Sequence, residues 1–520
     1  MNSVVVNAYF TGASGLFDSQ PSGRTDLRRP MVWSIAGSDS GGGAGLQADL
    51  KALAAFGVHA CTAVAAITAQ NSVAVTRVEP VSPELLDAQL AALAQDMPPA
   101  AIKTGLLGSV DNLRVVCRWV DRLRAQGQTV ALVVDPVLGS TTGADFADDV
   151  LVQAFARELL PRATLVTPNQ AEAQRLGLAV GQACDGVSVV ITGGDALGDD
   201  GLARDWFCSP QATGWLSLPR VDTPHHHGTG CTFASSAAAA LASGYCVADA
   251  VVLAKMATTH ALRHAYAAGQ GAGPVCAQPD FAQHAINLPA LSAPLDAAAF
   301  PALSHADLGV YAVVDSAAWV RRVLESGVRT VQLRIKDAAD PTLEAQIRES
   351  IVVANATPGA QLFINDHWQL ALRLGAYGVH VGQEDLDQVD LHALRQAGVR
   401  LGISTHSYWE VARSWAQRPS YIACGPIFAT QSKDMPWIPQ GPDNLRYWAG
   451  LLPLPVVGIA GIDTRNMAEV AAQGVVGAAV ITAITRAEDP GDACRRLMAE
   501  FARGRELMHG ALPMRAGPTL

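Results

Sequence analysis

Short apolar runs alternate with amphipathic stretches of helical length from Met31 almost to the C-terminus. In the first half the apolar runs are nearly continuous, which predicts a parallel sheet covered by helices on both faces. The expected strands are Val32–Gly37, His59–Thr68, Ala101–Lys103, Ala131–Asp135, Thr164–Thr167 and Val187–Thr192. Helical patterns between them include Ala44–Phe56 and Pro83–Gln95.

The second half contains eight shorter apolar runs, most of them separated by helix-length segments. They are Val310–Val314, Thr330–Leu333, Gln361–Ile364, Gly378–Val381, Arg400–Ile403, Tyr421–Ala423, Val456–Ile459 and Gly477–Ile481. Eight strand–helix units in about 200 residues are typical of a small (β/α)8 TIM barrel. Polar residues follow several runs, at the strand ends where such barrels place their active sites.

The chain of 520 residues is too long for one ordinary domain. Residues 1–30 lack periodicity, so we expect a disordered leader there. The segment 271–305 is rich in Ala, Pro and Gly, which predicts a linker. The expected domains are therefore an α/β domain at 31–270 and a barrel at 306–510, followed by a tail at 511–520.

Composition narrows the class of protein. Apolar residues make up 49% and charged residues 16%, as in globular proteins. Acidic residues outnumber basic ones by 47 to 37, giving a net charge of −10 without a basic cluster, which argues against nucleic-acid binding. No apolar stretch reaches the roughly 18 residues of a membrane span, and no secretory signal is visible. We expect a cytoplasmic enzyme acting on small molecules, with homo-oligomerisation left open.

The first half carries three groups of residues suited to phosphoryl transfer. The glycine-rich stretch Ile35–Asp49 follows a strand and leads into a helix, either as a ligand-binding loop or as a structural turn. Gly228–Thr232 precedes a predicted helix whose first amides would form an anion hole. Cys231 would lie in its first turn, where the helix dipole lowers a thiol pKa, unless it is simply a buried cysteine. Asn169 and Glu172 either hold Mg²⁺ and nucleotide phosphates or cap a helix.

Taken together, these stretches resemble the ribokinase-like hydroxymethylpyrimidine kinase/phosphomethylpyrimidine kinase family of thiamine biosynthesis, over about 31–268. The motifs are AGSDSGGGAGLQADLKALAAFGV, AITAQN, IKTGLLGS, VVDPVL, TPNQAEA and HGTGCT. The resemblance implies that Gln47 reads the pyrimidine in a pocket lined by Gly37 and Asp39, and that Cys231 assists deprotonation or lines the phosphoryl site. It implies an Mg-ATP site at Asp135, Asn169, Glu172, Thr192, Gly228 and Gly230. Thr192 stands where the family often has Lys.

The second half gathers charged residues at the predicted barrel mouth. Gln332, Arg334 and Lys336 alternate along a strand end and so share one face, which suits a diphosphate or a solvated strand end. Asp366 and Asp385 follow neighbouring runs, so they would form an Mg²⁺–diphosphate site or a salt-bridge network. Backbone amides after the seventh and eighth runs would bind a second phosphate.

This half resembles thiamine phosphate synthase over about 309–487. The motifs are QLRIK, INDHWQLALRLGAYGVHVGQED, GISTHS, YIACGPIFATQSKD and VVGIAGI. The resemblance implies pyrimidine diphosphate binding by Gln332, Arg334, Lys336, Asn365, Ser404 and Lys433, and Mg²⁺ binding by Asp366 and Asp385. It implies thiazole phosphate binding by Thr430, Gln431, Ser432, Gly461, Ile481 and Thr482.

The two resemblances imply one chain that phosphorylates hydroxymethylpyrimidine twice with ATP and Mg²⁺, then couples the diphosphate to thiazole phosphate. Mg²⁺, Arg334 and Lys433 would stabilise the leaving diphosphate, so positioning and charge stabilisation rather than base catalysis would carry the rate. Two alternatives stay open at this point. The first half could be a pyridoxal-type salvage kinase, or it could survive as a non-catalytic pyrimidine-binding regulatory module.

Overall fold

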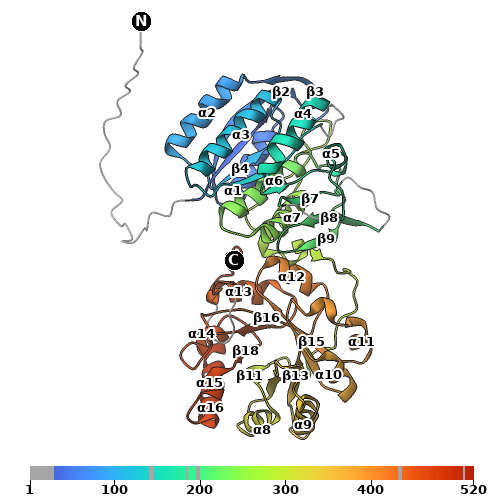
Figure 1. The fold of residues 1–520 in the computed structure, drawn as a ribbon, viewed down its shortest axis with the longest axis vertical. Coiled ribbons are helices and arrows are strands. Elements are labelled where there is room, and N and C mark those ends of the chain that lie inside the picture. Colours follow the sequence, from blue (N-terminus) through green and yellow to red (C-terminus); the bar gives the residue numbers. More distant parts are fainter. Residues whose placement is uncertain (1–28, 140–145, 183–185, 195–199, 431–435, 508–509) are drawn as a thin grey trace, which may run out of the picture.

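The computed structural model describes residues 29–139, 146–182, 186–194, 200–430, 436–507 and 510–520. The chain forms two α/β bodies that lie end to end, coloured blue to green and yellow to red in Figure 1. Most of the predicted leader lies outside the described residues, as do Gln431, Ser432 and Lys433. No helix in the described ranges is long and apolar enough to cross a membrane.

A ten-stranded sheet forms the centre of the first body, counted over the described residues. Its order is β10-β9-β8-β7-β6-β5-β4-β1-β2-β3. The strands are β1 (Met31–Asp39), β2 (His59–Gln70), β3 (Val75–Pro80), β4 (Ala101–Thr104), β5 (Ala131–Val134), β6 (Leu165–Val166), β7 (Ser188–Ile191), β8 (Leu202–Cys208), β9 (Thr213–Pro219) and β10 (Ala290–Leu291).

The sheet has the predicted parallel centre, and antiparallel strands that were not predicted extend it at both edges. The six central strands run parallel, as their apolar runs predict. At the edges, β3 pairs antiparallel with β2, and β8, β9 and β10 extend the other side antiparallel. An edge strand such as β3 is largely exposed, so it lacks the continuous apolar run that marks a central strand.

Helices cover both faces of this sheet because β1 directs alternate side chains to opposite sides. Val32 packs in one core with Leu53 of α1, and Trp33 packs in another with Leu86 of α2. The helices of the first body are α1 (Gly45–Phe56), α2 (Pro83–Asp96), α3 (Val110–Ala125), α4 (Asp149–Ala154), α5 (Gln170–Leu176), α6 (Thr229–Ala242) and α7 (Val247–Arg263).

The second body is a closed parallel barrel, and each of the eight predicted runs forms one of its described strands. They are β11 (Gly309–Val314), β12 (Thr330–Leu333), β13 (Gln361–Asn365), β14 (Gly378–Val381), β15 (Arg400–Thr405), β16 (Tyr421–Cys424), β17 (Val456–Ile459) and β18 (Gly477–Val480). The helices are α8 (Ala317–Glu325), α9 (Leu343–Asn355), α10 (Trp368–Leu374), α11 (Leu391–Gln396), α12 (Tyr408–Trp415), α13 (Gly441–Leu451), α14 (Met467–Ala471), α15 (Thr482–Thr485) and α16 (Pro490–Arg505).

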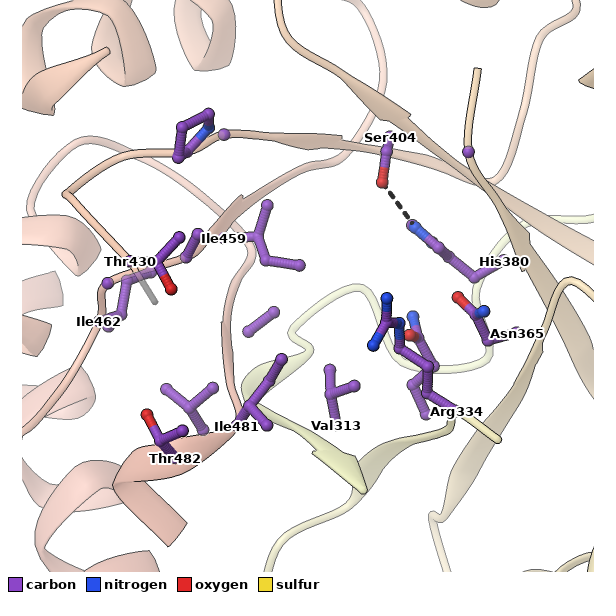
Figure 2. A pocket seen from close by; sticks show the side chains of 18 of the residues that line it. Val313, Arg334, Asn365, His380, Ser404, Thr430, Ile459, Ile462, Ile481 and Thr482 are labelled. Carbon is purple, nitrogen blue, oxygen red and sulfur yellow. Dashed lines mark hydrogen bonds between the residues drawn. The ribbon is translucent and has the colours of Figure 1, made fainter. Parts of the chain in front are cut away.

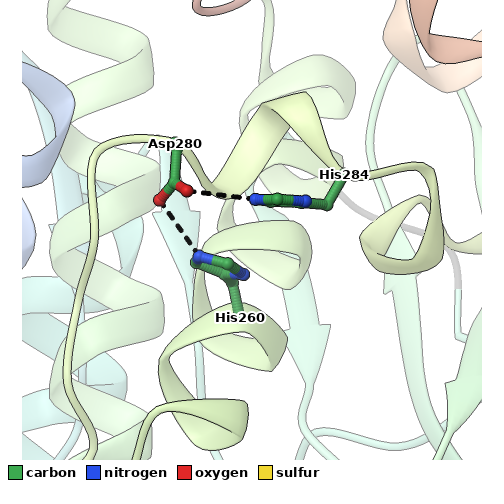
Figure 3. Close-up of side chains that lie close together, drawn as sticks. All are labelled: His260, Asp280 and His284. Atoms are coloured by element: carbon green, nitrogen blue, oxygen red, sulfur yellow. Dashed lines mark hydrogen bonds and ion pairs between the residues drawn. The ribbon is translucent and has the colours of Figure 1, made fainter.

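The segment predicted as a linker, 271–305, is fastened to the first body over much of its length. Its residues Ala290 and Leu291 form β10 and pair with β9. Asp280 accepts hydrogen bonds from the Nε2 atoms of His260 and His284, at 3.2 and 3.0 Å, and so clasps the segment to α7 (Figure 3). The boundary at 270 is therefore placed too early, because composition alone does not reveal these contacts.

The two bodies share one hydrophobic core, which includes Tyr245 of the first and Tyr408 and Trp448 of the second. The predicted tail, 511–520, lies between them. The amide of Ala516 donates to the Tyr408 hydroxyl at 2.9 Å, and the Tyr245 hydroxyl donates to the Ala516 carbonyl. Arg515 lies over the ring of Phe56 and donates to its carbonyl. The bodies are thus joined by buried contacts as well as by the connecting chain.

Candidate active sites

The glycine-rich turn after β1 is organised by Asp39. Its carboxylate accepts hydrogen bonds from the amides of Gly41, Gly43 and Ala44 at 2.8 to 3.0 Å, and lies 3.2 Å from His227 Nε2. Burial alone would raise the pKa of Asp39, but the hydrogen bonds from His227 and these amides outweigh it and lower the pKa. Asp39 therefore holds the turn as a carboxylate.

Gln47 is also engaged in this turn. Its side-chain oxygen accepts from the Asp39 amide at 2.9 Å, and its side-chain nitrogen donates to the Ser38 hydroxyl at 2.9 Å. The predicted pyrimidine reader thus lies beside Asp39, close to Gly37 at the end of β1. Its contact with a pyrimidine stays a prediction.

The two predicted glycine loops meet in the fold. Gly228 is the N-cap of α6 with a φ of 85°, and a Cβ there would lie 2.0 Å from the carbonyl oxygen of Gly43. Only glycine allows this backbone and this close approach. The first turn of α6, with Gly230 and Cys231, is thereby placed against the turn after β1.

A buried charge network beneath these loops was missed by the sequence reasoning. Lys103 of β4 is fully buried, and its Nζ lies 2.9 Å from Asp49 and 3.6 Å from Asp135. Asp49 also accepts hydrogen bonds from the hydroxyls of Ser34 and Ser235. A lysine inside an apolar strand was the available signal, since buried lysines require partners.

Two ionisable groups of the kinase-like site have raised pKa values. Burial raises the pKa of Asp135 to about 6, with Lys103 opposing the rise. Burial raises the pKa of Cys231 to about 12, again against the pull of Lys103. The expectation that the helix dipole lowers the Cys231 pKa is therefore wrong, because desolvation of the thiolate outweighs the dipole.

Asn169 and Glu172 form a reciprocal cap on α5. The Asn169 side chain accepts from the Glu172 amide, and the Glu172 carboxylate accepts from the Asn169 amide, both at 2.9 Å. Glu172 also accepts from the amide of Leu138, which follows Asp135 in the loop after β5. Thr192 pairs with Asn169 in a β-bridge, so it lies at the same sheet edge. The capping interpretation is confirmed, while nucleotide binding by these residues stays a prediction.

The barrel encloses a cavity of about 430 Å³ at the carboxyl ends of its strands. Ten of the predicted residues line it: Gln332, Arg334, Asn365, Asp366, Asp385, Ser404, Thr430, Gly461, Ile481 and Thr482. Arg334, Asn365 and Ser404 lie on one side in Figure 2, and Thr430 and Thr482 lie on the other. The cavity therefore has two separate polar walls.

Lys336 is not among the residues that line this cavity. Strand β12 ends at Leu333, and the Lys336 side chain beyond it is exposed. The alternation that places Gln332 and Arg334 on one face does not continue, because Lys336 lies past the end of the strand.

Asp366 and Asp385 lie close enough to influence each other. Burial raises the pKa of Asp366, the negative charge of Asp385 raises it further, and Arg334 opposes both. The backbone of Asp366 is left-handed, with a φ of 59°, and its carboxylate accepts a hydrogen bond from Asn365 at 2.5 Å. The sequence prediction that these two carboxylates meet at one mouth is thus confirmed.

A hydrogen-bonded chain of neutral groups underlies the cavity, and sequence reasoning did not single it out. His380 contacts the Ser404 hydroxyl through Nε2 at 2.9 Å (Figure 2) and the Tyr421 hydroxyl through Nδ1 at 2.7 Å. Tyr421 contacts Tyr311, which accepts from Gln332. Burial, helped by the charge of Arg334, lowers the pKa of His380 to about 3, so the imidazole is neutral. The signal was a histidine within an otherwise apolar barrel strand.

The opposite wall depends on a tight backbone approach. Gly461 has a φ of 70°, and a Cβ there would lie 2.6 to 2.8 Å from atoms of Phe428 and Ala429. The amides of Ile427 and Phe428 donate to the carbonyls of Ile459 and Ala460, which joins the two loops. This packing brings the turn after β17 beside Thr430 and the start of α15.

Comparison with known proteins divides the chain into the same two parts as the fold does. Residues 39–276 match the family described as phosphomethylpyrimidine kinase, and residues 310–484 match thiamine monophosphate synthase. A probable thiamine biosynthetic bifunctional enzyme, chloroplastic, of Oryza sativa subsp. japonica is 34% identical over 497 residues, covering 89% of this chain and 87% of that protein. The chain belongs to the family of thiamine biosynthetic bifunctional enzymes.

Separate proteins resemble each half of this bifunctional enzyme. The thiamine-phosphate synthase of Serratia proteamaculans is 51% identical over 208 residues, which are 40% of this chain and 97% of that protein. An ADP complex of Bacillus subtilis pyridoxal kinase shares 32% identity with a TM-score of 0.43, covering 48% of this chain and 97% of that one.

The bifunctional enzyme acts in thiamine biosynthesis as a phosphomethylpyrimidine kinase and a thiamine-phosphate synthase. The mixed sheet is its ribokinase-like kinase domain, and the TIM barrel is its synthase domain. The family match supports this kinase activity over the pyridoxal-type and non-catalytic alternatives.

Proposed function

We propose that the kinase domain phosphorylates hydroxymethylpyrimidine with Mg-ATP to its monophosphate and then to its diphosphate. The barrel then couples the diphosphate to thiazole phosphate, giving thiamine phosphate and diphosphate. The observation that supports this best is the single cavity with two polar walls, since a reaction between a diphosphate and a monophosphate requires two anion sites around one reacting centre.

The kinase site has the donors and acceptors that Mg-ATP requires. The Oδ2 atom of Asp135 is buried 3.6 Å from Lys103 Nζ and accepts no hydrogen bond from the described residues, so it keeps lone pairs with which a bound cation could interact. In this proposal Asp135, Asn169 and Glu172 bind the Mg-nucleotide from the ends of β5 and β6. The first amides of α6, at Gly228 and Gly230, donate to the phosphoryl group, with Thr192 contributing from the nucleotide side.

Cys231 has a different role from the one that a lowered pKa would give it. With its pKa raised to about 12, the thiol is protonated at neutral pH. We therefore assign Cys231 to lining the phosphoryl site and donating a weak hydrogen bond there, rather than to removing the substrate proton.

The synthase cavity fits an Mg²⁺-bridged diphosphate on the wall of Arg334. Burial and the negative charge of Asp385 raise the pKa of Asp366, so the pair forms a site with surplus negative charge that a hard cation relieves, and Asp366 and Asp385 are the proposed ligands. When bound, Mg²⁺ would supply neutralisation of the charge on the diphosphate. Further contacts to this substrate are proposed for Gln332, Asn365, Ser404 and Lys433, whereas the exposed Lys336 lies outside the cavity.

The other wall receives the thiazole phosphate in this proposal. Thr430, Gly461, Ile481 and Thr482 present hydroxyl groups and the backbone of two tight turns, a typical phosphate-binding arrangement in barrels. Gln431 and Ser432 are proposed to contribute from outside the described residues.

The residues of the barrel act by positioning and by charge. Arg334 stabilises the departing diphosphate, and the neutral His380 orients Ser404 without adding a second positive charge. The thiazole nitrogen attacks the pyrimidine methylene carbon as its bond to the diphosphate oxygen breaks. No protein base is required for this step, which agrees with a cavity whose His380 is hydrogen-bonded to Ser404 and whose His406 is hydrogen-bonded to Glu410.

The test is reconstitution with the purified full chain. One reaction receives hydroxymethylpyrimidine, thiazole phosphate, ATP and Mg²⁺, and a second receives the pyrimidine diphosphate in place of ATP and the free pyrimidine. We expect thiamine phosphate in both. Product in the second reaction alone would refute the two-step phosphorylation, and absence of product in both would refute the proposed coupling.

A further inference from the structure

Helix α12 of the synthase barrel takes its N-terminal cap from the other domain. Its own N-cap residue, Ser407, makes no capping hydrogen bond. The amide of Trp409 instead donates to Oδ1 of Asp249 at 2.9 Å, and Asp249 belongs to the first turn of α7 in the kinase domain. A carboxylate at this place satisfies amides that the helix leaves unpaired and interacts favourably with its dipole.

Three other barrel helices, α8, α11 and α16, are capped by a side chain of the barrel itself. The side chains of Ser316, Asp390 and Asp489 accept hydrogen bonds at the starts of α8, α11 and α16, each as the residue directly before its helix. By contrast, α12 is tied to the first domain at both ends, since the indole of Trp415 donates to the carbonyl of Pro289, directly before β10, at 2.9 Å.

The cap lies in a desolvated interface. Asp249 is 2% exposed, and the rings of Tyr245 and Tyr408 meet edge to face beside it, with centroids 6.1 Å apart. A buried amide without its acceptor is costly, so the contact between Asp249 and Trp409 constrains the position of α12 more strongly than a surface contact would.

From its first turn, α12 reaches the synthase cavity through Glu410. This carboxylate is 1% exposed and accepts from both the amide and Nδ1 of His406, each at 2.6 Å. The His406 ring lies flat on Trp437, with centroids 3.7 Å apart and planes at 10°. Both rings line the cavity, where His406 follows β15 directly.

We propose that Asp249 is a positioning residue for the thiamine-phosphate synthase reaction, although it belongs to the kinase domain. By capping α12 it fixes the place of Glu410, and Glu410 fixes the wall formed by His406 and Trp437. A shift of this wall changes the width of the cavity against which the flat rings of the substrates pack. The effect therefore falls on substrate binding in the barrel and leaves phosphoryl transfer unchanged.

The test uses the full chain with Asp249→Ala and measures the two activities separately. The synthase is supplied with pyrimidine diphosphate and thiazole phosphate, so that the kinase step is bypassed. We expect kcat/KM of the synthase to fall roughly tenfold, mainly through KM, because a lost helix cap is worth about this factor. Kinase kinetics stay within about twofold. Asp249→Asn keeps an acceptor oxygen and restores most of the synthase activity.

Tyr447→Phe is the matched control, because the buried Tyr447 hydroxyl donates across the same interface to the carbonyl of Ala282 at 2.7 Å. It removes one buried interdomain hydrogen bond but keeps the ring packed against Tyr408 of α12 and leaves the Asp249 cap in place, so synthase KM should be unchanged. Combining Asp249→Ala with His406→Ala should give less than the sum of the two single losses in activation free energy, whereas Tyr447→Phe with His406→Ala should be additive.

Two results would overturn the proposal. One is an unchanged synthase KM in Asp249→Ala protein whose urea midpoint shows that it is folded. The other is additivity of Asp249→Ala and His406→Ala, which would show that Asp249 does not act through His406.

Discussion

Charged side chains in the kinase site are paired with one another, whereas those of the synthase site face a cavity. Lys103 lies between Asp49 and Asp135 without solvent contact, and the neighbouring loops are closed by their own hydrogen bonds. In the barrel, Arg334 and Asp366 line about 430 Å³ of space. The difference teaches that the first set of charges is satisfied within the fold, while the second set is left facing open space.

The largest effect is expected from removing the buried cation of the kinase site, Lys103. Lys103→Met leaves Asp49 and Asp135 without their partner, and an uncompensated buried charge costs about 3–5 kcal/mol. We expect urea denaturation to show such a loss in the free energy of unfolding, together with loss of kinase activity. Lys51→Met, at an exposed lysine that donates to the carbonyl of Gly42, is the control and should change stability little.

On the synthase side, Asp385→Asn should affect activity far more than stability. Loss of one carboxylate from the proposed Mg²⁺ pair should lower synthase kcat by about 100-fold, since metal neutralisation of a leaving group is worth several kcal/mol. Kinase activity, measured with ATP and the pyrimidine monophosphate, should not change. Asp387→Asn is matched, because this exposed carboxylate lies two residues away and pairs with Arg413. If synthase kcat fell equally in the two variants, Asp385 would have no specific role as a Mg²⁺ ligand.

Stability should fall at acidic pH, because the barrel contains a buried neutral histidine, His380. The folded-state pKa of His380 is about 3, below its ordinary 6.5, so only the unfolded chain binds this proton between those values. The contribution of His380 to stability is therefore present above about pH 6.5 and is lost as the pH falls, by about 1.4 kcal/mol per pH unit. His380→Gln should flatten the dependence of the urea midpoint on pH in this window. A variant as acid-sensitive as the parent chain would contradict this origin.

The smallest expected effect separates the two roles of Glu172. Glu172→Ala removes half of the reciprocal cap on α5 and should cost about 1 kcal/mol of stability. Glu172→Gln keeps an acceptor for the Asn169 amide but lacks the charge. If Glu172 binds the Mg-nucleotide, Glu172→Gln raises KM for ATP while stability is kept. An unchanged KM would leave Glu172 as a cap alone.

Much of this architecture could be predicted from the sequence because burial imposes a pattern. The eight barrel strands and the central strands of the sheet are apolar runs, and their polar ends therefore marked Arg334, Asp366 and Ser404. Edge strands such as β3 lack that pattern, since one side faces solvent. Lys103 and His380 were missed because their partners are distant in sequence, and only the fold reveals what a polar residue inside an apolar run contacts.

Predictions made from short stretches of sequence also failed where two segments of the chain pack against each other. The thiol of Cys231 lies at a helix start, as predicted, but the packing around it raises its pKa. The segment 271–305 has the composition of a linker, yet it contributes a strand and a clasp to the first domain. In both cases the deciding energy comes from burial by other parts of the chain, which a short window of sequence does not contain.

Residues 515–519 lie between the two domains, with Arg515 on Phe56, Ala516 between Tyr245 and Tyr408, and the Thr519 carbonyl on the amide of Ile438. These residues leave the ribosome after both domains have been synthesised. During translation, the kinase domain and the first barrel strands therefore emerge before residues 515–519 can contact them. We therefore expect final docking of the domains to come late in folding, and removal of residues 515–519 to weaken the contact between them.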